Sequence, residues 1–141
     1  MNRAQKIAVF NLVVFSSVSL ITAVAVTILY YIWGWPEAAR GMGFVGLGGL
    51  AGLSPLIFKK DPGTVTFDER DKLIHRTSIL AGFAMSYLWF CLTGTVFAFL
   101  FEPLLFKRLG LPIMIFGGAF VVGIVSSVVL LILYGRSDKN E

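Results

Sequence analysis

Residues 7–33 read IAVFNLVVFSSVSLITAVAVTILYYIW, an uninterrupted run without a charged side chain. Three further apolar runs follow, at about 38–58, 77–101 and 111–134. An α-helix needs about 20 apolar residues to cross about 30 Å of hydrocarbon, where charged side chains are costly. Of the twelve lysines and arginines, only Arg40 falls within a run, close to its start. The pattern predicts an all-α integral membrane four-helix bundle that forms a single domain over residues 1–141.

The overall composition supports a surface covered by lipid. The chain is 57% hydrophobic and 14% charged, whereas soluble domains are about 45–50% apolar and about 25% charged. The net charge of +4 would suit a nucleic-acid partner in a soluble protein. Beside membrane spans, basic residues instead set the topology and contact anionic lipid head groups. We therefore expect membrane lipids, and no nucleic acid, as partners.

The basic residues are distributed unequally between the two sides of the predicted bundle. Three lie on one side, at Arg40, Lys107 and Arg108. Nine lie on the other, at Arg3, Lys6, Lys59, Lys60, Arg70, Lys72, Arg76, Arg136 and Lys139. Because cytoplasmic loops carry the excess of lysine and arginine, the N- and C-termini and the central loop are predicted to be cytoplasmic.

The second run is rich in glycine. Residues 41–52 read GMGFVGLGGLAG, and small residues allow helices in membranes to approach closely. Gly48 and Gly52 form a GxxxG pair, and the fourth run carries a second small-residue face. The expected helix-packing interface consists of Gly41, Gly48, Gly52, Gly118 and Gly123, and the simplest arrangement packs the second span against the fourth. A GxGxxG match in this stretch is not a dinucleotide site, because no strand precedes it.

The most polar stretch is TVTFDERDKLIHRTS, residues 64–78. Thr66 and Glu69 fit a capping box, which predicts a helical foot over about 66–76 that projects from the third span into the cytoplasm. A single histidine and no nearby cysteine give no basis for a metal site unless a partner supplies ligands. The expected cytoplasmic interaction residues are Asp68, Glu69, Arg70, Ile74, His75 and Arg76.

This segment resembles a loop in a family of small multi-span membrane proteins of bacteria and archaea. The resemblance rests on Asp68-Glu69-Arg70, then Ile74 and Arg76, directly before a hydrophobic span. The chain departs from the family pattern at Thr77, where alanine often follows the basic residue. The family has no assigned activity, so the resemblance implies a location, the inner (cytoplasmic) membrane of a prokaryotic cell, and no reaction.

No group of residues in the sequence indicates catalysis. The spans contain no acidic residue of the kind that proton-coupled transport requires, and no nucleophile–base set is apparent. We therefore predict no catalytic residue, no metal, no cofactor and no enzymatic activity. One question stays open at Trp89, in the middle of the third span, because an aromatic face there could hold a partner helix, a pigment or a quinone.

Three functions remain compatible with the sequence. The first is a small non-enzymatic accessory or scaffold subunit that acts by helix packing within a membrane complex, with a membrane protein or further copies of itself as partner. The second is a small homo-oligomeric transporter or channel. The third is a membrane regulator that docks a soluble cytoplasmic protein on residues 64–76.

Overall fold

The computed structural model describes residues 3–35, 37–58 and 69–137, and every element in these ranges is helical. Three long α-helices dominate the fold, namely α1 (Arg3–Trp33), α3 (Glu69–Leu100) and α5 (Leu111–Ser137). The chain returns along α1 through a 3₁₀-helix, η1 (Glu37–Leu53), and a short helix, α2 (Ser54–Ile57). Between α3 and α5 it turns through α4 (Pro103–Leu105) and a π-helix, η2 (Phe106–Gly110). The predicted all-α class is confirmed.

Three helical stretches in the described residues are long and apolar enough to cross a membrane: Arg3–Trp33, Glu69–Leu100 and Phe106–Gly135. The distribution of side chains is the reverse of that in a soluble protein. Tyr31 and Phe99 are 81% and 83% exposed, whereas Ser54 and Ser78 are 2% and 1% exposed. Large apolar groups outside and small polar groups inside are compatible with a protein surrounded by lipid.

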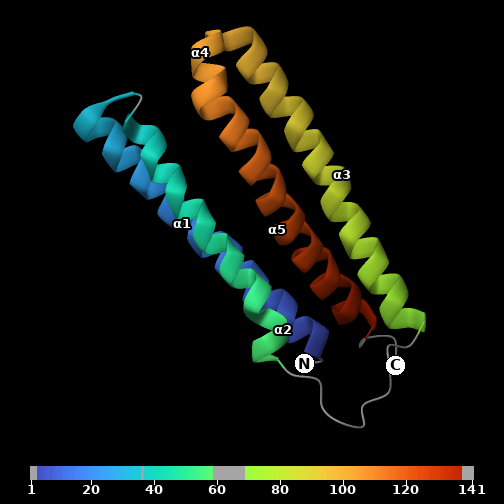
Figure 1. The fold of residues 1–141 in the computed structure, drawn as a ribbon. Helices are drawn as coiled ribbons and strands as arrows, with labels where there is room; N and C mark the ends of the chain where they lie inside the picture. Colours follow the sequence, from blue (N-terminus) through green and yellow to red (C-terminus); the bar gives the residue numbers. More distant parts are fainter. Residues whose placement is uncertain (1–2, 36, 59–68, 138–141) are drawn as a thin grey trace.

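The helices form two antiparallel hairpins. One pairs α1 with η1, the other pairs α3 with α5, and the two hairpins meet mainly where α1 contacts α5 (Figure 1). Helix α3 contacts α5 and the η2 turn and has no extensive contact with α1 or η1. The start of α1 and the end of α5 lie at the same end of the molecule, together with α2 and the start of α3 (Figure 1).

The second predicted span differs from the α-helix expected over 38–58, because most of it is the 3₁₀-helix η1. Residues 43–54 read GFV-GLG-GLA-GLS, with glycine first, a large apolar residue second and a smaller residue third in each triplet. A 3₁₀-helix has three residues per turn, so each position of the triplet forms its own face. At a rise of about 2.0 Å per residue, η1 is about 34 Å long, compared with about 26 Å for an α-helix of equal length.

The turns follow from a few residues. Helix α1 ends at Trp33, and Gly34 adopts a φ of +68°, a conformation that favours glycine. The backbone N–H of Gly34 donates to the carbonyl of Tyr30 at 2.8 Å. The segment 104–110, which joins the third and fourth predicted spans, is helical in α4 and η2. Pro103 begins α4, since proline fits the first turn of a helix.

The predicted cytoplasmic foot is described only in part. Helix α3 begins at Glu69, whereas the predicted N-cap, Thr66, lies outside the described residues.

Candidate functional site

Helices α3 and α5 meet along a seam of small residues. On α3, Ser78, Gly82 and Ser86 follow one another at four-residue intervals and are all buried. A Cβ atom added to Gly82 would lie 2.9 Å from the backbone carbonyl oxygen of Val122. The two helix backbones therefore approach too closely at this point to admit a side chain, as in other small-residue contacts between membrane helices.

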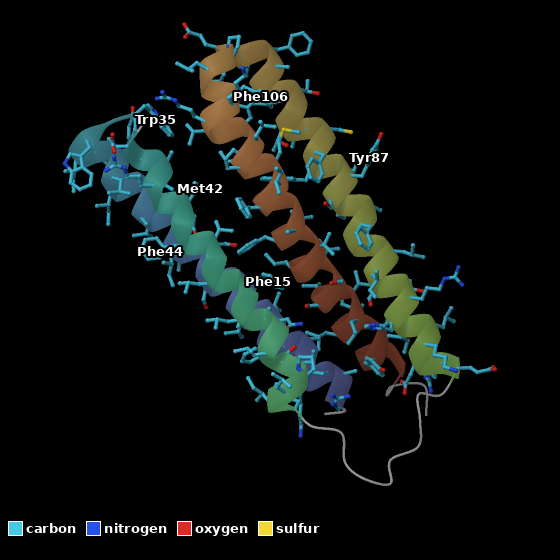
Figure 2. The ribbon with its side chains drawn as sticks, viewed as in Figure 1. Phe15, Trp35, Met42, Phe44, Tyr87 and Phe106 are labelled. Atoms are coloured by element: carbon cyan, nitrogen blue, oxygen red, sulfur yellow. The ribbon has the colours of Figure 1, made fainter. Side chains whose placement is uncertain are left out.

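Above this seam, aromatic rings of α3 cover glycines of α5. A Cβ atom added to Gly117 would lie 2.6 Å from the Trp89 ring, and one added to Gly118 would lie 2.7 Å from the Phe90 ring. The indole Nε1 of Trp89 also donates to the carbonyl of Ile113 at 3.3 Å. Trp89 thus packs within the hairpin, whereas Tyr87 is 70% exposed and projects outward (Figure 2).

Two phenylalanines join the hairpins. The ring of Phe15 covers Gly123, and the ring of Phe120 covers Gly48. The two rings meet edge to face with centroids 5.2 Å apart, and Phe15 lies on the side of α1 that faces α5 (Figure 2). Apart from this contact, helix η1 packs chiefly against α1 and meets α5 at few points. This arrangement differs from the expected packing of the second span against the fourth.

The predicted packing glycines fall into two groups. Gly41 lies against Val26 of α1, and Gly48, Gly118 and Gly123 lie under aromatic rings. Gly52, in contrast, has no atom within 4 Å of an added Cβ. Residues four apart in a 3₁₀-helix are separated by about 120°, so Gly48 and Gly52 lie on different faces.

Gly52 belongs to a stripe of glycines at every third position of η1. An added Cβ would meet nothing within 4 Å at any member of this stripe, which we name the open glycine stripe: Gly43, Gly46, Gly49 and Gly52. A second exposed row runs beside it, formed by the large side chains Phe44, Leu47, Leu50 and Leu53. The third row, Val45, Gly48, Ala51 and Ser54, is buried.

Side chains from three helices close the end of the molecule where the chain begins. A buried cluster joins Ala8 of α1, Ile74 of α3, and Leu130 and Tyr134 of α5. The hydroxyl of Tyr134 donates to Oδ1 of Asp71 at 2.7 Å. The Nε of Arg3 also donates to the carbonyl of Phe58 at 2.6 Å, just after α2.

The predicted cytoplasmic residues do not share one environment. Ile74 is buried in the cluster described above, whereas Glu69, Arg70, His75 and Arg76 are exposed along the first turns of α3. Asp68 lies outside the described residues. Within the described part of the chain, no group of three or more His, Cys, Asp or Glu side chains could hold a metal ion.

Several hydroxyl groups of the long helices donate hydrogen bonds to the backbone of their own helix. Six of them donate to the carbonyl four residues earlier, namely those of Ser19, Thr27, Thr93, Thr95, Ser126 and Ser127. Such bonds satisfy hydroxyls without a partner helix. Thr22 Oγ1 and Asn11 Oδ1 are buried on α1 without a hydrogen-bond partner in the described residues.

Sequence reasoning missed three features of this arrangement. The four-residue spacing of the small residues at 78, 82 and 86 indicates the face of α3 that forms the seam with α5. The triplet period of residues 43–54 carried the signal for η1 and its open glycine stripe. The bond between Tyr134 and Asp71 had no signal, because it joins residues that are distant in sequence.

Comparisons of the chain with protein-family models, with curated proteins and with solved structures find no match. The resemblance of residues 68–76 to a family of small membrane proteins therefore stays a prediction.

Proposed function

We propose that this chain is a small non-enzymatic subunit of the prokaryotic inner membrane that acts by packing against a transmembrane helix of a larger complex. The observation that carries the proposal is the open glycine stripe on η1. Glycine in a helix interior costs about 1 kcal/mol relative to alanine. Four glycines on an exposed face, with nothing within 4 Å of an added Cβ atom, therefore reduce stability without a compensating contact in the described part of the chain.

Close packing against a partner helix would offset the stability that these glycines cost. Small residues in membrane helices allow two backbones to approach, and the neighbouring row of Phe44, Leu47, Leu50 and Leu53 would then flank the contact. Phe15 and Phe120 meet between the hairpins, so aromatic rings occupy the interior at that level. This filling favours a packing function over a transport path through the chain.

The exposed start of α3 offers a second contact on the proposed cytoplasmic side. Glu69, Arg70, His75 and Arg76 are exposed there, whereas Ile74 is part of the buried cluster. A partner that contacts both surfaces would bind the membrane-embedded helix η1 and the polar end of α3.

The test uses the tagged full-length chain, purified in mild detergent from membranes of its source and analysed by mass spectrometry. We expect a membrane protein to co-purify with the natural sequence. The Gly46→Leu/Gly49→Leu variant should lose this partner and keep its thermal stability, because both added side chains point into open space.

Two controls separate the partner contact from the fold. Gly135→Leu on α5 also adds a side chain at an open position and should retain the partner. Gly48→Leu should lower thermal stability, because Phe120 occupies the space that the new side chain needs. Purification of the natural chain with only itself and lipid, or retention of the partner by the Gly46→Leu/Gly49→Leu variant, would contradict the proposal.

A further inference from the structure

One face of α3 makes no extensive contact with another helix in the described residues. The buried residues of α3 are Ile74, Ser78, Gly82, Ser86 and Thr93, and their spacing places them on the side that packs against α5. In the described residues, α3 makes no extensive contact with α1 or η1. The face opposite the seam is therefore open over most of its length.

Five exposed residues follow one another along this open face. Their spacings of four, four, three and four residues keep them on one side of an α-helix. We name them the outer stripe of α3: Lys72, Arg76, Leu80, Phe83 and Tyr87. Leu80, Phe83 and Tyr87 are 58%, 60% and 70% exposed, and Tyr87 projects away from α5 (Figure 2).

The outer stripe divides into a cationic end and an apolar end. Neither Lys72 nor Arg76 forms an ion pair with another described residue. The acid directly before Lys72 in sequence, Asp71, is turned toward α5 and accepts the hydrogen bond of Tyr134. From Arg76 to Tyr87 the helix rises by about 16 Å, which is close to half of the hydrocarbon thickness of about 30 Å.

We propose that the outer stripe of α3 binds an anionic phospholipid of the adjacent leaflet. Its phosphate group lies between Lys72 and Arg76, and an acyl chain follows Leu80, Phe83 and Tyr87. The two cations complement a net negative head group and give no comparable gain to a zwitterionic one. A soluble anion would leave the apolar part of the stripe without a partner. The site does not depend on the helix partner of η1, although both require α3 to cross the membrane.

The test measures lipid retention by the full chain. The protein is reconstituted in nanodiscs with equal amounts of phosphatidylglycerol and phosphatidylcholine, and the lipids retained after release are counted by native mass spectrometry. The natural chain should retain phosphatidylglycerol preferentially. The Lys72→Gln/Arg76→Gln variant should lose about tenfold or more of this preference, given that each basic residue near a membrane surface strengthens anionic binding about fivefold.

A matched variant removes the same charge from the opposite end of the bundle. Lys107→Gln/Arg108→Gln should keep the preference of the natural chain, because these exposed residues lie beyond the far end of α3. Phe83→Ser should weaken retention without altering the head-group preference, since it removes part of the acyl-chain surface. If the double glutamine variant does not fold, Arg76→Gln alone should show a loss of about fivefold.

Several results would overturn the proposal. An unchanged preference in the Lys72→Gln/Arg76→Gln variant would remove its basis, and so would an equal loss in both double variants, which would show an effect of net charge alone. Competition by glycerol phosphate as strong as that by intact lipid would show that the apolar part of the stripe contributes nothing. If the Lys72→Gln/Arg76→Gln variant no longer bound a soluble protein that the natural chain binds, but still retained lipid, Lys72 and Arg76 would belong to a protein-binding site.

Discussion

The hydroxyl group of Tyr134 joins the end of α5 to the first turn of α3 through its 2.7 Å bond to Asp71 Oδ1. Its ring is buried among Ala8, Ile74 and Leu130. We expect Tyr134→Phe to retain this packing but to leave the carboxylate without its donor. Hydrogen bonds to charged groups contribute about 1.5–3 kcal/mol, so the variant should unfold at a lower temperature in detergent.

Tyr87 provides the matched control for this prediction. Its side chain is 70% exposed, and its hydroxyl forms no hydrogen bond with any described residue. Tyr87→Phe should therefore leave the thermal midpoint of the purified chain unchanged. Equal midpoints for Tyr134→Phe and the natural chain would show that the bond to Asp71 does not hold the two helix ends together.

At the scale of single residues, the sequence indicated where helices approach but not which helices. Gly118 and Gly123 stood out as small residues, and the structure places Phe90 and Phe15 over them. Their neighbours belong to α3 and α1 rather than to the second span. A glycine indicates that another helix or side chain packs closely at that position. Which helix it is depends on how whole helices are rotated about their axes, and no local sequence pattern encodes this rotation.

Among the elements, η1 departs most from expectation, since 3₁₀-helices longer than three or four residues are uncommon. The glycine content predicts close α-helical packing, whereas the period of three in residues 43–54 matches the three residues per turn of the 3₁₀-helix. The long helices were easier to predict, because α1, α3 and α5 are marked by apolar runs with glycine or proline at their ends. The π-helix η2 has no comparable signature.

Distance measurements test the 3₁₀ geometry of η1. Spin labels at the exposed positions Arg40 and Leu53 are separated by thirteen residues, which corresponds to about 26 Å in a 3₁₀-helix and about 20 Å in an α-helix. Pulsed electron paramagnetic resonance should give the longer distance, in a chain whose single cysteine, Cys91, is replaced by serine.

A second labelled pair calibrates this measurement. Lys72 and Met85 are also thirteen residues apart and exposed, and both lie on the α-helix α3. They should give about 20 Å. Equal distances for the two pairs would show that η1 is α-helical in the membrane and that its triplet faces do not form.

At the scale of the whole molecule, the charge pattern and the arrangement of helices agree. The structure brings the start of α1, the end of α2, the start of α3 and the end of α5 to one end (Figure 1). Lys6 and Arg70 lie at this end, and Arg40 and Lys107 lie near the two turns at the other. The unequal distribution of lysine and arginine predicted this grouping, because an even number of crossings returns the chain to its starting side. The distribution of charges could not predict that α5 lies between α1 and α3.

The positive-inside rule then predicts which end faces the cytoplasm. In bacterial spheroplasts, a membrane-impermeant maleimide should label Lys107→Cys while the spheroplasts are intact. It should label Lys6→Cys and Arg70→Cys only after lysis, and each variant is made in a chain with Cys91→Ser. All three positions are exposed near helix ends, so equal labelling in detergent controls for reactivity. Because the structure places Lys6 and Arg70 at the same end, labelling of these two positions from opposite sides would contradict the spanning arrangement itself. Labelling of both in intact spheroplasts, with Lys107→Cys protected, would instead reverse the orientation and leave the fold unchanged.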